Sequence, residues 1–155
     1  MRAVVQRVTS GSVEVDRFRV AGIGKGIVVL LGICRSDTVP DADWMARKLA
    51  ELRIFDDEEG KLNLSLSDIG GEALVVPNFT LYGDARKGRR PSYTEAAGFD
   101  QGRTLFDLCC ERLESHGISV KRGVYGATMA VSLTNDGPVT LILEHPDSRA
   151  DDPSG

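Results

Sequence analysis

A short apolar segment between two glycines restricts the fold of this chain more than any other feature. Every residue from 27 to 31 is apolar, so neither side of the segment is suited to contact with water. A run of this length and composition is typical of a strand in the middle of a sheet that is covered on both faces. Residues 26–32 are therefore expected to form a central strand.

Further strands are predicted before and after this segment. Apolar and polar residues alternate over 2–16, and Ser10-Gly11 has the composition of a turn, so this stretch is interpreted as a β-hairpin. Residues 18–23 and 73–81 are interpreted as two more strands. The last three strands are expected over residues 118–125, 129–134 and 139–143.

Two helices are predicted between these strands. Apolar residues recur at helical spacing over 40–54, with Thr38 available as the N-cap and Pro40 in the first turn. The same spacing returns over 100–116, and Gly117 is suited to end that helix in a left-handed conformation. The predicted class is therefore α+β, with mostly antiparallel strands in a barrel-like or two-sheet arrangement and two helices packed outside.

Length and charge restrict the classes of function. The 155 residues fit a single domain, which is expected over 1–145, followed by a disordered tail over 146–155. A formal net charge of −4 argues against a protein that coats nucleic acid with its whole surface. No apolar run is long enough to cross a bilayer and no signal peptide is seen, so a cytoplasmic protein without a membrane partner is expected.

Residues for nucleophilic or metal chemistry are few. Only two histidines occur, His116 and His145, and their spacing supports no metal site, so no metal or other cofactor is expected. Cys109 and Cys110 lie in the second predicted helix, where core packing is the favoured interpretation over a nucleophile.

Two loop segments have a candidate function beside an ordinary structural one. The cations of the first segment are Arg86, Lys87, Arg89 and Arg90, followed by Tyr93. They could bind RNA phosphates while the tyrosine stacks on a base, or they could form a solvated loop; the residues alone favour neither.

The second segment, residues 135–138, has the composition of a plain hairpin turn. The bond between Gly137 and Pro138 can also be cis at modest cost, which would turn two successive carbonyl groups the same way. Such a pair could accept hydrogen bonds from an ammonium group.

Six motifs occur in order along the chain: Met1-Arg-Ala-Val-Val-Gln-Arg-Val8, Arg53-Ile-Phe-Asp56, Gly60-Lys-Leu-Asn-Leu-Ser65, Phe79-Thr-Leu81, Lys87-Gly-Arg-Arg-Pro-Ser92 and Val131-Ser-Leu-Thr-Asn-Asp-Gly-Pro-Val-Thr140. Together they resemble the bacterial and eukaryotic D-aminoacyl-tRNA deacylase family. The resemblance implies hydrolysis of the ester bond of D-aminoacyl-tRNA, and of glycyl-tRNA mischarged on tRNA(Ala), as a proofreading step.

The resemblance also implies how the substrate is selected. It predicts a homodimer in which a cis Gly137-Pro138 pair crosses the interface, binds the substrate α-amino group through its carbonyls and leaves no space for an L side chain. Arg7 would support this pair, and Asn135 belongs to the same substrate-binding group. The cations of the 86–90 segment would contact the tRNA.

Phe79 and Thr80 would line the cavity for the 3′-terminal adenosine, with backbone N–H groups stabilising the oxyanion. The resemblance favours the ribose 2′-hydroxyl as the group that assists hydrolysis, with Thr80 as a positioning residue. The alternative makes Thr80 Oγ1 the nucleophile, but the sequence offers no neighbouring base.

Pro77-Asn78 departs from the Ser-Gln pair usual in the family. Proline at the first position also occurs in a related animal group that removes L-alanine from mischarged tRNA, so relaxed chirality is a second hypothesis. A weakened homologue that only binds tRNA is a third. The presence of Arg7, which the resemblance associates with the cis Gly137-Pro138 pair, favours D-specificity over both.

Overall fold

The computed structural model describes residues 1–146; residues 147–155, most of the predicted tail, lie outside the described residues. The large sheet contains β1 (Arg2–Val15), β2 (Phe18–Ile23), β3 (Gly26–Gly32), β6 (Glu72–Pro77), β7 (Ser119–Arg122) and β8 (Ala130–Glu144). A separate ribbon pairs β4 (Arg53–Asp56) with β5 (Leu62–Ser65). The helices are α1 (Val39–Glu51), α2 (Leu66–Ile69), α3 (Phe99–Ser115) and the 3₁₀ turn η1 (Phe79–Tyr82).

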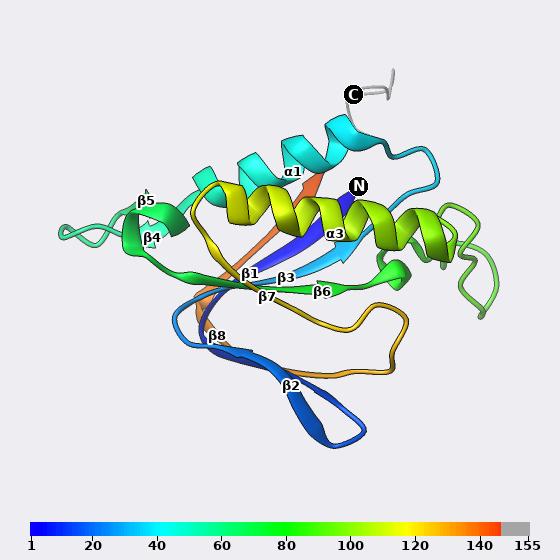
Figure 1. Cartoon of the computed structure of the whole chain (residues 1–155), viewed down its shortest axis with the longest axis horizontal. Coiled ribbons are helices and arrows are strands. Elements are labelled where there is room, and N and C mark those ends of the chain that lie inside the picture. Colours follow the sequence, from blue (N-terminus) through cyan, green and yellow to red (C-terminus); the bar gives the residue numbers. More distant parts are fainter. Residues whose placement is uncertain (147–155) are drawn as a thin grey trace.

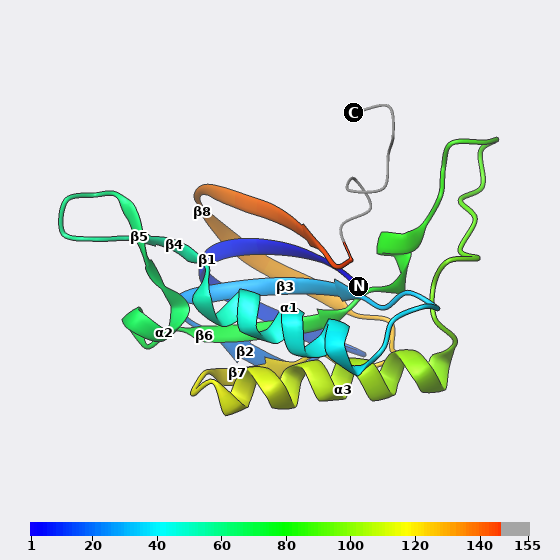
Figure 2. The same cartoon turned by 90° about the horizontal axis from the view of Figure 1, so that it is seen from above.

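The sheet is curved around its first strand. One edge of β1 pairs with β3 through residues 2–8 and then with β2 through residues 11–15, while β8 pairs along the other edge. All these pairings are antiparallel, whereas β3, β6 and β7 run parallel to one another. Helices α1 and α3 lie side by side over one face, and β2 lies on the opposite side of the sheet (Figures 1 and 2). The predicted α+β class is confirmed.

Both faces of the central strand are covered, as its composition predicts. Val29 on one face belongs to the core under α1 and α3, and Val28 on the other belongs to a smaller core. Cys109 and Cys110 are buried in the larger core, so their interpretation as packing residues is confirmed. Burial raises the pKa of both thiols, that of Cys110 to about 12, which keeps them protonated and unreactive.

The predicted turn at Ser10-Gly11 is wrong, because β1 continues through it to Val15. Gly11 serves close packing instead: a Cβ there would lie 2.8 Å from Cγ2 of Val28. The chain reverses at Asp16 and Arg17, both with positive φ, as a two-residue hairpin turn of this hand requires.

Three other predicted boundaries are wrong. Helix α1 ends at Glu51, and the last residues assigned to it begin β4, in which Ile54 and Phe55 are both buried. Strand β6 ends at Pro77, which has no N–H to continue a ladder, and η1 follows. Strand β7 ends at Arg122, before the predicted limit of 125. No helix within residues 1–146 has the length and apolarity to span a bilayer.

Candidate active site

A cavity of about 880 Å³ opens where β3 and β6 end. The ends of these strands contribute Leu31 and Pro77, and the chain following β6 contributes the Asn78–Thr80 segment. Ligands commonly bind beyond the carboxyl ends of parallel strands, where the chain leaves the sheet. The cavity therefore lies where the fold itself favours a binding site.

One wall of the cavity is the turn η1, where the sequence analysis placed Phe79 and Thr80. Asn78 starts the turn after its N–H bonds to the carbonyl of Leu31 at 2.8 Å. Its side-chain oxygen accepts a hydrogen bond from Thr80 Oγ1 at 2.5 Å. Phe79 and Thr80 are exposed, whereas Pro77 and Asn78 are half-buried. All four predicted residues are thus brought together at the cavity.

The opposite wall was missed by the sequence analysis. It is formed by the chain between β7 and β8, by the start of β8 and by the start of α3, and its residues include Phe99, Tyr125, Gly126, Thr128 and Met129. Two glycines in this segment, Gly123 and Gly126, were the sequence features that could have indicated this wall. Gly126 has a φ of 81°, and a Cβ there would lie 2.6 Å from the ring of Phe99. A Cβ at Gly123 would lie 2.9 Å from Sδ of Met129, so the chain passes close to this wall at both glycines.

The lining carries no charged group. Its described residues include no Asp, Glu, His, Cys, Lys or Arg, and its polar side chains are Asn78, Thr80, Tyr125 and Thr128. Burial raises the pKa of Tyr125, so this hydroxyl remains a neutral hydrogen-bonding group. Among residues 1–146, no cluster of three or more His, Cys, Asp or Glu is placed to hold a metal ion. The cavity can position a substrate but offers no nucleophile paired with a base.

The cationic loop, which carries Arg86 to Arg90, follows η1 in the chain. Its base is closed by two backbone hydrogen bonds between Asp84 and Ser92, of 2.7 and 2.9 Å. Tyr93 packs edge-on against Phe79, with ring centroids 5.2 Å apart. The loop extends away from the body of the protein (Figure 2, right). The structure therefore places the loop next to η1.

The four cations of the loop differ in their surroundings. Arg86 binds the carboxylate of Asp84 through two nitrogens, at 2.9 and 2.7 Å. Hydrogen bonds from Arg86 lower the pKa of Asp84 to about 2, so the carboxylate remains charged. All four cations are exposed, Arg86 included. Arg86 differs from the other three in its two hydrogen bonds to Asp84.

Residues 136–139 form a bulge inside one long strand, not a turn between two. Strand β8 pairs with β1 on both sides of the bulge, at Gln6–Thr140 and at Val8–Asn135. The side-chain nitrogen of Asn135 donates to the carbonyls of Arg7 and Val139, both at 3.0 Å, and closes the base of the bulge. The Gly137–Pro138 bond is cis, as the resemblance implied, and both residues are exposed.

Arg7 supports the bulge from below. It is only 7% exposed, and its Nε donates to the carbonyl of Asp136 at 3.1 Å. Its Nη1 donates to the carbonyl of Ile54 at 3.0 Å and lies 3.4 Å from a carboxylate oxygen of Asp56. A buried guanidinium thus connects β1, β4 and the bulge.

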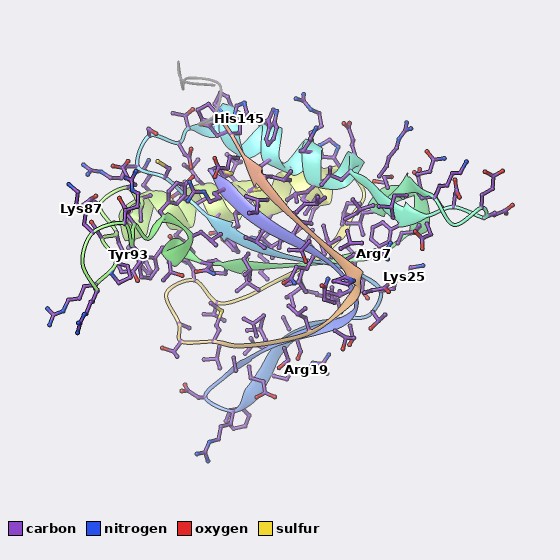
Figure 3. The ribbon with its side chains drawn as sticks, turned by 180° about the vertical axis from the view of Figure 1, so that it is seen from behind. Arg7, Arg19, Lys25, Lys87, Tyr93 and His145 are labelled. Carbon is purple, nitrogen blue, oxygen red and sulfur yellow. The ribbon has the colours of Figure 1, made fainter. Side chains whose placement is uncertain are left out.

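The predicted site residues fall into two groups that are well separated within the chain. Arg7 pairs with Ile27 at the start of β3, whereas the cavity begins at Leu30, about 10 Å further along the same strand. Figure 3 shows Arg7 on the opposite side of the molecule from Tyr93 and Lys87. Gly137 and Pro138 do not line the cavity of their own chain.

Known proteins resemble this chain over almost its whole length. A family model described as D-Tyr-tRNA(Tyr) deacylase matches residues 4–144. The D-aminoacyl-tRNA deacylase of Myxococcus xanthus (strain DK1622) is 53% identical over 150 residues, covering 97% of this chain and 98% of the relative. That of Chloroflexus aurantiacus (strain ATCC 29364 / DSM 637 / Y-400-fl) is 52% identical over 149 residues, covering 96% and 93%.

Two solved structures share the fold. One, described as c-Myc DNA Unwinding Element Binding Protein, has a TM-score of 0.88 and 41% identity, covering 94% of this chain and 99% of the other. The second, described as a probable eukaryotic D-amino acid tRNA deacylase, has a TM-score of 0.78 at 20% identity, covering 92% and 97%.

Proposed function

Because the chain belongs to the D-Tyr-tRNA(Tyr) deacylase family, we propose that it hydrolyses the ester bond of D-aminoacyl-tRNA and of glycyl-tRNA mischarged on tRNA(Ala). The observation that carries the proposal is the large cavity beside a cationic loop, lined by hydrogen-bonding and apolar groups but by no ionised side chain. Such a lining suits the terminal adenosine of a tRNA and its ester. The enzyme is expected to act in the cytoplasm without a metal or other cofactor.

The reaction is assigned mainly to the substrate and to backbone groups. Water attacks the ester carbonyl, the ester C–O bond breaks, and the ribose oxygen leaves with a proton. Phe79 and Thr80 are the first two residues of η1. The first N–H groups of a helical turn have no acceptor inside the turn, so those of Phe79 and Thr80 would donate to the oxyanion. The neighbouring 2′-hydroxyl would assist the attack while Thr80 positions the ribose. The described lining has no Asp, Glu, His, Cys or Lys that could act as a base for Thr80, which favours this route over a Thr80 nucleophile.

The second copy of the chain would complete the site. In this proposal Gly137 and Pro138 enter the cavity of the partner subunit, where their carbonyls accept hydrogen bonds from the substrate α-amino group. Their exposure supports it, since a bulge fixed by Arg7 and Asn135 presents both residues to solvent at a distance from their own cavity. A rigid backbone close to the Cα atom would leave space for a hydrogen where an L substrate carries its side chain.

Release of amino acid from D-tyrosyl-tRNA and from glycyl-tRNA(Ala), measured with EDTA present, tests the proposed activity. Release from both substrates at the rate seen without EDTA is expected. Activity on D-tyrosyl-tRNA alone would remove the glycyl substrate from the proposal. Loss of activity with EDTA would contradict the metal-free mechanism.

The Pro77-Asn78 pair is the reason to consider relaxed chirality or tRNA binding alone beside D-specific hydrolysis. The structure accommodates the proline ring, because Gly123 opposite it has no side chain; a Cβ at Gly123 would lie 3.2 Å from Pro77 Cδ. The contacts of Arg7 with the bulge support a chirality filter that is intact. D-specific deacylation is therefore proposed over L-alanine removal or binding alone.

Replacing both residues with the usual pair, P77S with N78Q, is expected to change kcat/KM for D-tyrosyl-tRNA by less than about threefold, a difference below 1 kcal/mol. The reason is that Asn78 already supplies an amide and Thr80 already has its hydrogen-bond acceptor. Hydrolysis of L-alanyl-tRNA by the native protein but not by the double variant would support relaxed chirality. Activity that appears only in the double variant would support the hypothesis that the native protein binds tRNA without hydrolysing it.

The cationic loop gives a separate prediction about tRNA affinity. The double variant R89Q/R90Q is expected to weaken tRNA binding and to lower the slope of log K against log salt by about 1 to 2, since each phosphate contact releases condensed counterions. The matched control is R103Q/R112Q on α3, which removes the same charge from a different surface. Equal salt slopes for the two variants and the native protein would show that Arg89 and Arg90 do not contact the tRNA.

A further inference from the structure

We propose that Arg2 is a positioning residue for the reaction, because it fixes the turn η1 that carries Thr80 to the body of the protein. The inference rests on the proposed function for the importance of η1, and it adds a residue that lies outside the cavity. Arg2 belongs to the first strand, far in sequence from the turn that it contacts.

The guanidinium group of Arg2 connects three elements. Its Nη1 donates to the carbonyl oxygen of Leu81 at 2.6 Å, and its Nε donates to Oε1 of Glu144 at 2.7 Å. Its Cζ atom lies over the Tyr82 ring, 4.7 Å from the ring centroid. The side chain is 31% exposed, and two hydrogen bonds and the aromatic contact hold it in place.

The turn η1 is short, so a bond from outside it matters for its position. It is four residues long, and 3₁₀ turns have poorer hydrogen-bond geometry than α-helices. The N–H of Leu81 bonds to Asn78 at 3.3 Å, and the N–H of Gly83 bonds to Thr80 at 2.9 Å. Carbonyl groups at the end of a helical turn have no partner inside it, and Arg2 supplies a donor for one of them, that of Leu81.

The turn η1 also rests directly on the backbone of β3. A Cβ at Gly32 would lie 3.1 Å from Cβ of Leu81 and 3.2 Å from the ring of Tyr82. Gly32 is also the residue that pairs with Arg2 across β1 and β3. The turn is thus seated on Gly32 and held by its strand neighbour Arg2, while Glu144 orients the guanidinium.

This arrangement links Arg2 to the reacting groups through a single peptide unit. Thr80 directly precedes Leu81, so a shift of the Leu81 carbonyl would move the Thr80 hydroxyl and the N–H groups that open the turn. Catalysis depends on geometry at this scale, since a displacement of about 1 Å can lower a rate about 100-fold. Loss of Arg2 should therefore lower kcat more than it raises KM.

Steady-state kinetics on D-tyrosyl-tRNA tests this role with R2M and R2K. R2M is expected to lower kcat about 10-fold to 100-fold with KM changed less than about threefold. R2K, which retains the charge but cannot direct two separate donors, should recover part of the loss. The control is R112M, which breaks another surface pair, with Asp43 at 2.8 Å, between α3 and α1. The inference fails if R2M and R112M have equal kcat, or if a lower unfolding temperature accounts for the loss.

Amide hydrogen exchange gives a readout that does not depend on the activity. R2M should speed exchange at Leu81 and Gly83, the two amides bonded within or at the end of η1, while R112M leaves them unchanged. If the native protein does not hydrolyse D-tyrosyl-tRNA but R2M speeds exchange, Arg2 holds η1 in place and the proposed function is rejected. If the native protein is active and R2M changes neither exchange nor kcat, only the role given to Arg2 is rejected.

Discussion

The variant R7M is expected to lower kcat/KM for D-tyrosyl-tRNA about 100-fold or more, because it removes the support of the bulge that carries Gly137 and Pro138. The buried guanidinium donates to the carbonyl of Asp136 and to that of Ile54, and methionine can replace neither bond. A Cβ at Gly137 would lie 3.1 Å from Nη2 of Arg7, so side chain and bulge are in close contact. Steady-state hydrolysis of D-tyrosyl-tRNA measures the effect.

Stability must be separated from activity for this variant. R7M leaves the carbonyls of Asp136 and Ile54 without these donors, and a buried acceptor without a partner costs about 1 to 3 kcal/mol, so R7M should also unfold at a lower denaturant concentration. Rates are therefore compared at a temperature where R7M is fully folded, with R112M as the control at an exposed pair. A folded R7M with native activity and native preference for D substrates would contradict the role given to the bulge.

Mixing two inactive variants is expected to restore activity, because each cavity is proposed to use the bulge of the partner subunit. A127W blocks the cavity from a residue of its lining. G137V places a branched side chain where φ is 125°, a conformation that such residues avoid, and distorts the bulge. Each variant alone should be less than about 1% active, a loss of about 2.7 kcal/mol or more in transition-state stabilisation.

Co-refolding the two variants in equal amounts should form mixed dimers in half of the population. Each mixed dimer has one intact cavity facing one intact bulge, so about a quarter of native activity should return. Mixing the folded proteins without exchange of subunits is the control. No recovery after co-refolding, with mixed dimers detected by mass, would show that each chain uses its own bulge or none.

Local patterns predicted those parts of the fold that depend on short stretches of sequence. The apolar run at 27–31 identified the buried strand, and Thr38 with Pro40 identified the start of α1. The errors arose where a distant contact decides the conformation. Gly11 was taken for a turn because its packing against Val28 depends on a strand further along the chain. The end of α1 was missed because Leu52 continues the helical spacing, whereas β4 depends on pairing with β5 further along the chain.

The candidate site was predicted in part for the same reason. Asn78 to Thr80 and the cationic loop are contiguous, so a motif could identify them. The wall at 125–129 carries no charged residue, and only the folded chain brings it opposite η1. The pairing of Arg86 with Asp84 was also missed, although the two residues are only two apart in sequence, because a cation cluster does not reveal which member binds a carboxylate.

The most direct test of the central claim is the rate at which the purified protein releases amino acid from D-tyrosyl-tRNA and from L-tyrosyl-tRNA under identical conditions. The proposed site predicts rapid release from the D substrate and a rate on the L substrate no greater than that of spontaneous hydrolysis. Comparable release from both substrates, or release from the L substrate alone, would contradict a cavity that excludes the L side chain.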